Sequence, residues 1–230
     1  MRIGGFQKFS LIDYPGKISA IIFTQGCNFR CSYCHNPELV DPDLFSPPLD
    51  EELILSFLKE RSGRLDGVVI TGGEPLVQGD LIEFVERIKQ MGYSIKIDTN
   101  GSYPQRLQEL MAGGLIDYIA MDIKAPLEKL SNVAGVPVST EKIVESISLI
   151  LGSNIDYEFR TTVVKNLLTV EDLVSIARLI KGARRYVLQK FVMSKILDDN
   201  FASSAKCFSD EELASIRNEL KKYVNECIVR

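Results

Sequence analysis

The 230-residue sequence has little of what marks membrane proteins, nucleic-acid-binding proteins or repeat proteins. No apolar run approaches the roughly 18 residues of a membrane-spanning helix, and the first five residues do not open a signal peptide. The 27 basic residues do not gather into a run, and 31 acidic residues outnumber them. The charge pattern therefore does not indicate binding to nucleic acid or to an anionic membrane. No low-complexity tract is present. We therefore expect a cytoplasmic globular protein that acts on a small molecule or a protein.

Cysteine is scarce outside one short segment. Cys27, Cys31 and Cys34 lie within eight residues, whereas Cys207 and Cys227 lie near the C-terminus. Such crowding fits metal ligands in a reducing compartment better than a disulfide framework. Thiolates are the usual ligands of iron–sulfur clusters, and a cubane has four irons. The spacing therefore predicts a [4Fe-4S] cluster with one iron left open for a ligand other than protein.

Two plainer interpretations of these cysteines stay open. Cys3His is a known structural zinc set, and His35 would supply its fourth ligand, although the adjacent Cys34 and His35 would then have to turn onto one ion. Unliganded cysteines that pack as small hydrophobic side chains are the other alternative. Cys207 and Cys227 are expected to be packing or incidental thiols.

Short apolar segments rich in Ile and Val alternate with helical patterns along the chain. The expected strands span residues 18–24, 67–71, 94–98, 118–123, 157–164 and 185–191. The expected helices include 53–58 and 81–88, segments that begin at residues 104, 140 and 169, and a C-terminal helix of about residues 209–225. Leu81, Phe84, Val85 and Ile88 share one face, and the last helix begins with the capping-box pattern Ser209-Asp210-Glu211-Glu212. Alternation of this kind favours parallel strands with helical crossovers. It predicts one α/β domain over residues 1–230, either an open sheet or an incomplete (βα)6 parallel barrel, with a cysteine loop at residues 24–36.

The unusual residues follow the carboxyl ends of the expected strands. These are Cys27 after the first strand, Gly72-Gly73-Glu74-Pro75 after the second, Asp98-Thr99-Asn100-Gly101 at the third, and Asp122 with Lys124 at the fourth. Because α/β folds place their sites at these ends, we expect the four loops to converge. Gly-Gly and Asn-Gly are also common in ordinary turns.

The acidic residues at the strand ends need partners. A carboxylate such as Asp98, at the end of an apolar strand, calls for either a ligand ammonium or a cation. Asp122 and Lys124 are two positions apart and share one face of their strand. A structural ion pair is the alternative to a binding role for these two residues.

Together these motifs resemble the radical S-adenosylmethionine enzymes. Cys27, Cys31 and Cys34, with the aromatic Tyr33 before the last cysteine, match that family's cluster motif, and the Gly72 to Pro75 segment matches its glycine-rich motif. The resemblance covers nearly the whole chain. It implies the incomplete (βα)6 barrel of that family and an oxidoreductase that cleaves S-adenosylmethionine reductively at a [4Fe-4S] cluster, yielding a 5′-deoxyadenosyl radical.

The resemblance also implies a role for each matched residue in cofactor binding. The open iron would bind the amino and carboxylate groups of S-adenosylmethionine, and the backbone from Tyr33 to His35 would lie along its adenine. Gly72 or Gly73, together with Glu74, would hold the methionine ammonium.

Within that family, the chain is most similar to the activating enzymes of glycyl-radical proteins, in which a His-Asn pair such as that at His35 follows the third cysteine. There, the positions of Asp98 and Asp122 help to bind the cofactor or a monovalent cation, and that of Lys124 binds the methionine carboxylate. Arg160 matches a basic residue near the site.

The segments at residues 10–17 and 22–27 resemble the subgroup that activates anaerobic ribonucleoside-triphosphate reductase, which the resemblance implies as the partner. Some relatives place a histidine after the sixth strand, against the cofactor ribose. His35 is the only histidine here, so Gln189 or a backbone group near Phe191 is expected to take that place. The short segment from Cys34 to Thr71 leaves no room for a second cluster domain, which implies an external electron donor of flavodoxin or ferredoxin type.

Two further functions remain as alternatives. One is a radical S-adenosylmethionine enzyme that modifies a small molecule, as deazaguanine synthases do, although that group usually has Asp-Thr where this chain has His35-Asn36. The other is a non-catalytic iron–sulfur or zinc protein, which would leave the convergence of the four loops unexplained.

Overall fold

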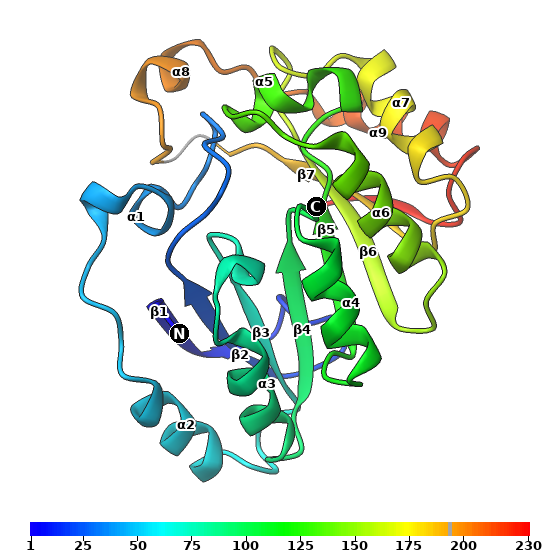
Figure 1. The fold of residues 1–230 in the computed structure, drawn as a ribbon. Helices are drawn as coiled ribbons and strands as arrows, with labels where there is room; N and C mark the ends of the chain where they lie inside the picture. The colour runs from blue at the N-terminus through cyan, green and yellow to red at the C-terminus, as the bar shows by residue number, and fades with distance from the viewer. Residues whose placement is uncertain (193–194) are drawn as a thin grey trace. The chain divides into compact units, whose positions relative to one another are not determined.

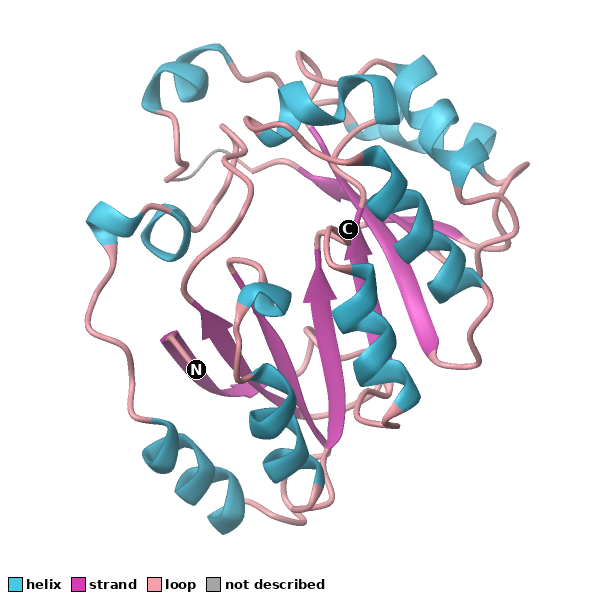
Figure 2. Ribbon diagram, viewed as in Figure 1, coloured by secondary structure: helices cyan, strands magenta, loops and turns pink. Residues whose placement is uncertain are grey.

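The computed structural model describes residues 1–192 and 195–230. Strands and helices alternate along most of the chain (Figures 1 and 2). The strands are β1 (Ile3–Ser10), β2 (Ser19–Thr24), β3 (Gly67–Gly72), β4 (Ser94–Thr99), β5 (Tyr118–Asp122), β6 (Asp156–Val163), β7 (Tyr186–Lys190) and β8 (Cys227–Val229). The α-helices are α1 (Pro37–Val40), α2 (Glu51–Glu60), α3 (Leu81–Lys89), α4 (Pro104–Ala112), α5 (Leu130–Ala134), α6 (Thr140–Leu151), α7 (Val170–Leu179), α8 (Asp199–Ser204) and α9 (Asp210–Leu220). Short 3₁₀ turns are η1 (Pro42–Leu44), η2 (Pro75–Val77) and η3 (Leu127–Lys129).

The six expected strands are confirmed as β2 to β7, each within one residue at both ends. The strand order follows the chain from β1 to β8. Strand β2 pairs in parallel with β3, β3 with β4, β6 with β7 and β7 with β8, whereas β1 runs antiparallel to β2. The α/β interpretation is therefore correct, and the sheet is mixed rather than purely parallel because of β1.

Three features of the fold differ from the sequence prediction. Strand β1 was not expected, because Gly4, Gly5 and the polar residues that follow leave no apolar run. Strand β8, which has only three residues, was also not expected. The last helix ends at Leu220 rather than near residue 225, because the chain turns there and the carbonyl of Tyr223 accepts a hydrogen bond from Gly182, which leads the segment to its pairing with β7.

Two compact units make up the described chain, and they interleave along the sequence. The first holds residues 1–28, 36–99 and 105–119, and the second holds residues 29–35, 100–104 and 120–230. The boundary falls inside β5, and the cysteine loop contributes to both units. The single domain expected over residues 1–230 stays a prediction.

In the first unit, β2 to β4 are lined by apolar side chains that helices α2 and α3 help to bury. Helix α3 lies beside β4 in Figure 1 and buries the residues that the sequence placed on one face, Leu81, Phe84, Val85 and Ile88. Helix α2 buries Ile54, Leu55 and Leu58. Each buried aliphatic side chain contributes about 1.5–3 kcal/mol of transfer free energy, so these helices are held chiefly by their apolar faces.

In the second unit, helix α9 packs against β8 and against α7, and both helices have well-formed N-termini. Helix α9 begins with the predicted capping box, in which Ser209 and Glu212 satisfy each other's backbone amides. Thr169 and Asp172 form the same arrangement at the start of α7. In the described part of the chain, none of the helices has the length and apolar character needed to cross a membrane.

Candidate active site

The turn after β3 lies against the start of the cysteine loop, within the first unit. The amide of Gly73 donates to the carbonyl of Thr24 (2.9 Å), and the amide of Glu74 donates to that of Gly26 (2.9 Å). A Cβ on Gly73 would stand 2.0 Å from the Gly26 oxygen, so only glycine fits. The glycine was expected to admit a ligand. Its observed role is to seat the turn against the residues that precede Cys27.

Gly72 is glycine for a second reason. Its φ of +112° lies in the left-handed region, which a side chain would strain. A Cβ there would also meet the amide nitrogen of Thr24 at 2.5 Å. The Gly-Gly pair is thus demanded by backbone packing between the ends of β2 and β3.

The carboxylate of Glu74 is buried and holds the end of β3 to the end of β4. Its Oε1 atom accepts from the amide of Leu76 (3.1 Å), which caps the 3₁₀ turn η2, and from the Thr99 hydroxyl (2.7 Å). Both donors are neutral, so the negative charge of Glu74 is stabilised by dipoles.

Asp98 has a partner inside the chain that sequence reasoning missed. The ammonium of Lys96, two positions earlier on the same face of β4, forms an ion pair with Asp98 Oδ1. Lys96 is buried in the strand. The signal was present in the sequence, because Lys96 and Asp98 repeat in reverse the two-residue spacing of Asp122 and Lys124.

In the second unit, Asp122 lies between two cations. Its Oδ1 accepts from Arg160 Nε (2.7 Å) and its Oδ2 from Lys124 Nζ (3.0 Å). Burial would raise the pKa of Asp122, but the charges of Arg160 and Lys124 hold that pKa well below its usual range. The ion pair that the sequence left as an alternative is present, and it includes Arg160. The trio carries a net positive charge, which suits an anionic ligand group.

Lys124 is the electrostatic link between this trio and the cysteine loop. Burial lowers the pKa of Lys124, but Asp122, Tyr33 and Cys31 together raise it above its usual range, so the ammonium stays charged. Burial raises the pKa of the Cys31 thiol to about 11, and Lys124 opposes that rise. A metal-free Cys31 is therefore a neutral thiol at pH 7, and binding to iron would release its proton.

Backbone bonds hold the part of the cysteine loop that belongs to the second unit. The carbonyl of Cys34 accepts from the amide of Leu197 (2.9 Å), and that of Ser32 accepts from Asp198 (3.1 Å). A segment near the C-terminal third of the chain therefore fixes the loop, and sequence spacing gives no sign of such a contact.

A second backbone contact positions the loop from the other side. The amide of Arg30 donates to the carbonyl of Ala134 (2.7 Å). Gly135, which ends helix α5 with φ +69°, passes so close that a Cβ on it would lie 2.3 Å from the Arg30 oxygen. Gly135 is thus a further residue that the motifs did not identify.

His35, the sole histidine, is bound to the end of β7. Its ring stacks on Phe191 with centroids 5.3 Å apart, and its Nε2 lies 3.0 Å from the carbonyl oxygen of Val192. The sequence analysis predicts that a group at this strand end replaces a histidine found in some relatives. The same strand end instead contacts the histidine that is present. The exposed Cys207 donates to the Phe191 carbonyl (3.2 Å), whereas Cys227 is buried.

Tyr33 points its hydroxyl into the protein. The side chain is buried, and in residues 1–192 and 195–230 its oxygen has no hydrogen-bond partner. Burial raises the pKa of Tyr33, so the hydroxyl is neutral. A buried polar atom without a partner marks a place where a bound group would complete the hydrogen bonding.

The cysteines of the loop are distributed over the two units. None of the five cysteines forms a disulfide in the described part of the chain, and Cys27 belongs to the first unit whereas Cys31 and Cys34 belong to the second. Among the described residues, no three His, Cys, Asp or Glu side chains are arranged to hold a single metal ion, and His35 is engaged with Val192. A cubane is bound at separate irons, so its thiolates need not converge on one point.

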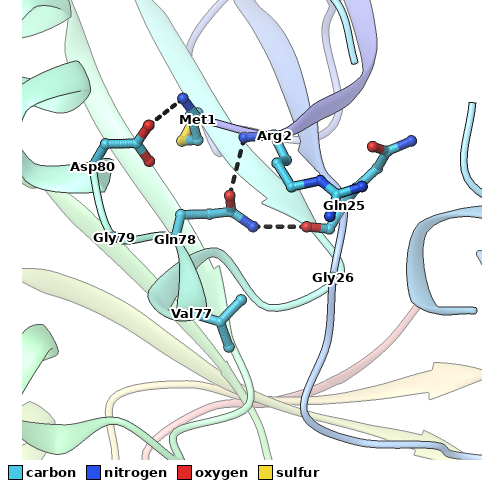
Figure 3. Close-up of a pocket in the computed structure, with 8 residues that line it drawn as sticks. All are labelled: Met1, Arg2, Gln25, Gly26, Val77, Gln78, Gly79 and Asp80. Carbon is cyan, nitrogen blue, oxygen red and sulfur yellow. Dashed lines mark hydrogen bonds and ion pairs between the residues drawn. The ribbon is translucent and has the colours of Figure 1, made fainter. Parts of the chain in front are cut away.

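An open pocket of about 770 Å³ lies next to the start of the cysteine loop, within the first unit (Figure 3). Across it, the side chain of Gln78 accepts from the amide of Arg2 (3.0 Å) and donates to the carbonyl of Gln25 (2.7 Å). None of the residues that the sequence assigned to the site lines this pocket. The hydrogen bonds of Gln78 tie β1 and the 3₁₀ turn η2 to the residues before Cys27.

Comparison with known proteins identifies the family. The model of the radical SAM superfamily, named for S-adenosylmethionine, matches residues 21–191. A Methanocaldococcus jannaschii protein named as a glycyl-radical enzyme activating enzyme is 34% identical over 99% of this chain and 95% of its own length. The pyruvate formate-lyase-activating enzyme of Clostridium pasteurianum is 36% identical over 54% of this chain and 52% of its own.

Solved structures agree on the fold. Streptococcus suis SuiB bound to S-adenosylmethionine superposes with a TM-score of 0.70, at 13% identity, over 91% of this chain and 49% of that one. A domain of the pyruvate-formate lyase-activating enzyme from Bacteroides vulgatus superposes with a TM-score of 0.58, at 17% identity, over 71% of this chain and 98% of that one. The expected partial barrel is confirmed. The chain therefore belongs to the radical S-adenosylmethionine superfamily and, within it, to the glycyl-radical enzyme activating enzymes.

Proposed function

We propose that this protein activates an anaerobic ribonucleoside-triphosphate reductase by creating a glycyl radical on it. The observation that carries the proposal is the similarity along 99% of the chain to a glycyl-radical enzyme activating enzyme. The choice of reductase rests on a narrower resemblance, in residues 10–17 and 22–27. When bound, the reduced [4Fe-4S] cluster supplies the electron that cleaves S-adenosylmethionine into methionine and a 5′-deoxyadenosyl radical.

The cysteines would hold the cluster in this proposal. Cys27, Cys31 and Cys34 would bind one iron each as thiolates and leave the fourth iron to S-adenosylmethionine. Lys124 would help Cys31 to stay ionised, since it already opposes the rise in the pKa of that thiol. The single set of three cysteines supports an external electron donor of flavodoxin or ferredoxin type.

Charged residues assigned from the resemblance would bind the two ends of the methionine moiety. Glu74, which accepts from the Leu76 amide and the Thr99 hydroxyl, would also accept the methionine ammonium beside Gly72 and Gly73. Lys124 and Arg160 outnumber the single carboxylate of Asp122 and would favour the methionine carboxylate. The backbone from Tyr33 to His35 would follow the adenine, with the unpartnered Tyr33 hydroxyl nearby.

The substrate would be a backbone glycine. The 5′-deoxyadenosyl radical takes one hydrogen atom from its Cα–H bond, which gives 5′-deoxyadenosine and a carbon-centred glycyl radical. Reacting atoms must come within about 3–3.5 Å, so the glycine loop of the partner would have to enter this protein. A transient complex is the expected consequence.

One observation favours a second candidate, a radical enzyme that modifies a small molecule. The 7-carboxy-7-deazaguanine synthase of Methanopyrus kandleri is 32% identical over 49% of this chain and 52% of its own length. The shorter match and the His35-Asn36 pair after the third cysteine favour the activating enzyme. A monovalent cation near Asp98 and Asp122 is implied by the resemblance alone, and both carboxylates accept hydrogen bonds from lysine or arginine side chains.

The test is anaerobic incubation of the reconstituted protein with S-adenosylmethionine, a reductant and the candidate reductase. We expect a glycyl radical signal on the reductase by electron paramagnetic resonance, with one 5′-deoxyadenosine released per radical. Cleavage of S-adenosylmethionine that is equally fast without the reductase, and leaves no radical on it, would favour the small-molecule enzyme.

A further inference from the structure

Lys96 is a buried cation to which the proposed function assigns no role. It lies in the middle of β4 between Ile95 and Ile97, in register with Val69 of β3, and only 2% of it is exposed. An ammonium in such surroundings is unfavourable unless a fixed anion pairs with it. The position therefore carries a function that a hydrophobic residue would not serve.

The fixed anion is Asp98, at the carboxyl end of the same strand. Lys96 Nζ donates to Asp98 Oδ1, and the Asp98 side chain is 13% exposed, so the ion pair is largely removed from water. The next residue, Thr99, donates to Glu74. The ion pair and the Thr99–Glu74 hydrogen bond thus both belong to the carboxyl end of β4, from successive residues of the strand.

We propose that Lys96 is a built-in counter-ion for Asp98, so that this protein needs no monovalent metal ion at that carboxylate. A sodium or potassium ion bound to Asp98 would lie close to the Lys96 ammonium, which binds the same carboxylate. Two positive charges that share one carboxylate repel each other strongly where water is largely excluded. The ammonium is tethered by its strand, so it is present at any ionic composition.

The other carboxylate assigned to a cation is satisfied in the same way. Both oxygens of Asp122 already accept from charged donors, one from Arg160 and one from Lys124. Each unit thus provides protein cations where the resemblance implied an added ion. The inference rests on the proposed function only for its consequence, which is that S-adenosylmethionine affinity is independent of sodium and potassium.

The first arm of the test uses the protein without cluster or cofactor. The melting temperature of the unmodified chain should be equal within about 1 °C in potassium, sodium and choline chloride at one ionic strength. In choline, Lys96→Ala should melt roughly 6–20 °C lower, because Asp98 loses its counter-ion. Potassium or ammonium chloride should restore part of that loss.

Two further variants make the first arm specific. Lys96→Ala combined with Asp98→Asn should show no response to the cation. Lys89→Ala is the matched control, because Lys89 pairs with Asp117 in the same unit but the two side chains are 29% and 38% exposed, so a smaller loss without cation rescue is expected. If Lys96→Ala does not fold, Lys96→Met with Asp98→Asn should fold, since a packed neutral pair tolerates burial.

Two results of this arm would overturn the proposal. One is stabilisation of the unmodified chain by potassium that Asp98→Asn abolishes, which would place a cation at Asp98 beside the ammonium. The other is a Lys96→Ala variant that is as stable as Lys89→Ala and whose melting temperature does not change with potassium.

The second arm measures S-adenosylmethionine binding by the anaerobically reconstituted protein in potassium and in choline chloride. Affinity should agree within about twofold. A tenfold gain in potassium, about 1.4 kcal/mol, would overturn cation independence. Failure to bind S-adenosylmethionine in either salt would instead contradict the proposed function, while the first arm would still decide the role of Lys96.

Discussion

The two units differ in how many cations pair with a carboxylate at the strand ends. In the first, the ammonium of Lys96 pairs with one carboxylate, that of Asp98. In the second, Lys124 and Arg160 both pair with the carboxylate of Asp122. The first pair is neutral and the second set carries a net positive charge, so the second set favours an anionic group by its formal charge.

The units also position the cysteine loop by different means. In the first unit, glycine backbone packs on backbone, and a Cβ on Gly73 would collide with Gly26. In the second, backbone hydrogen bonds from Leu197 and Asp198 hold the loop from a distant part of the chain. The Gly-Gly motif marks the position of the first device but not its packing role, and nothing in the sequence marks the second, so only the fold reveals both contacts.

The largest expected effect comes from the cysteines, because both units contribute to that set. Cys27→Ala in the first unit, or Cys31→Ala or Cys34→Ala in the second, should each prevent stable binding of a four-iron cluster. Iron and sulfide analysis after anaerobic reconstitution measures this. Cys207→Ala and Cys227→Ala are the controls and should load normally. One zinc per chain without iron uptake would remove the radical mechanism.

The next effect tests the net positive set. Asp122→Asn leaves Arg160 and Lys124 without their anion, and all three side chains are less than a quarter exposed. Breaking such a buried pair costs about 3–5 kcal/mol, which urea denaturation would measure. Asp156→Asn is the control in the same unit, since its pair with Arg184 is exposed and should cost less than about 1 kcal/mol. Equal losses would show that the trio is not a buried electrostatic unit.

Cofactor affinity tests the charge comparison directly. Glu74→Gln in the first unit and Lys124→Met in the second should each weaken S-adenosylmethionine binding by about 1.5–3 kcal/mol, roughly ten- to a hundredfold. Asp98→Ala should weaken it by a similar factor. Titration of the reconstituted protein measures the loss, and iron content should stay unchanged. Unaltered affinity in both Glu74→Gln and Lys124→Met would assign these residues to structural ion pairs and dipole contacts alone.

The smallest effect concerns the backbone contact in the first unit. Gly73→Ala should destabilise the protein by roughly 1–3 kcal/mol through overpacking against Gly26. Gly79→Ala, in the same turn region, has nothing within 4 Å of the added Cβ and should be close to neutral. Chemical denaturation of the two variants supplies the comparison, and iron loading of Gly73→Ala reports on Cys27. Equal stability of the two would contradict a forced contact.

The sequence by itself determined the elements whose information is local. Apolar runs of Ile and Val marked β2 to β7, because burial on both faces leaves a continuous hydrophobic pattern. The Ser209 capping box marked the start of the last helix. The spacing of Cys27, Cys31 and Cys34, together with the Gly72 to Pro75 motif, identified the radical S-adenosylmethionine family. Each of these signals lies within a few residues of its consequence.

Only the tertiary structure decided which distant side chains contact one another. Glu74 meets Thr99, Asp122 meets Arg160, and the ring of His35 meets Phe191. These contacts join residues that are 25 to 156 positions apart, so no local pattern predicts them. The same holds for β1 and β8, which have weak apolar patterns and exist because a neighbouring strand supplies their hydrogen bonds. Buried charges take the partner that the fold brings near, and that choice is made by packing.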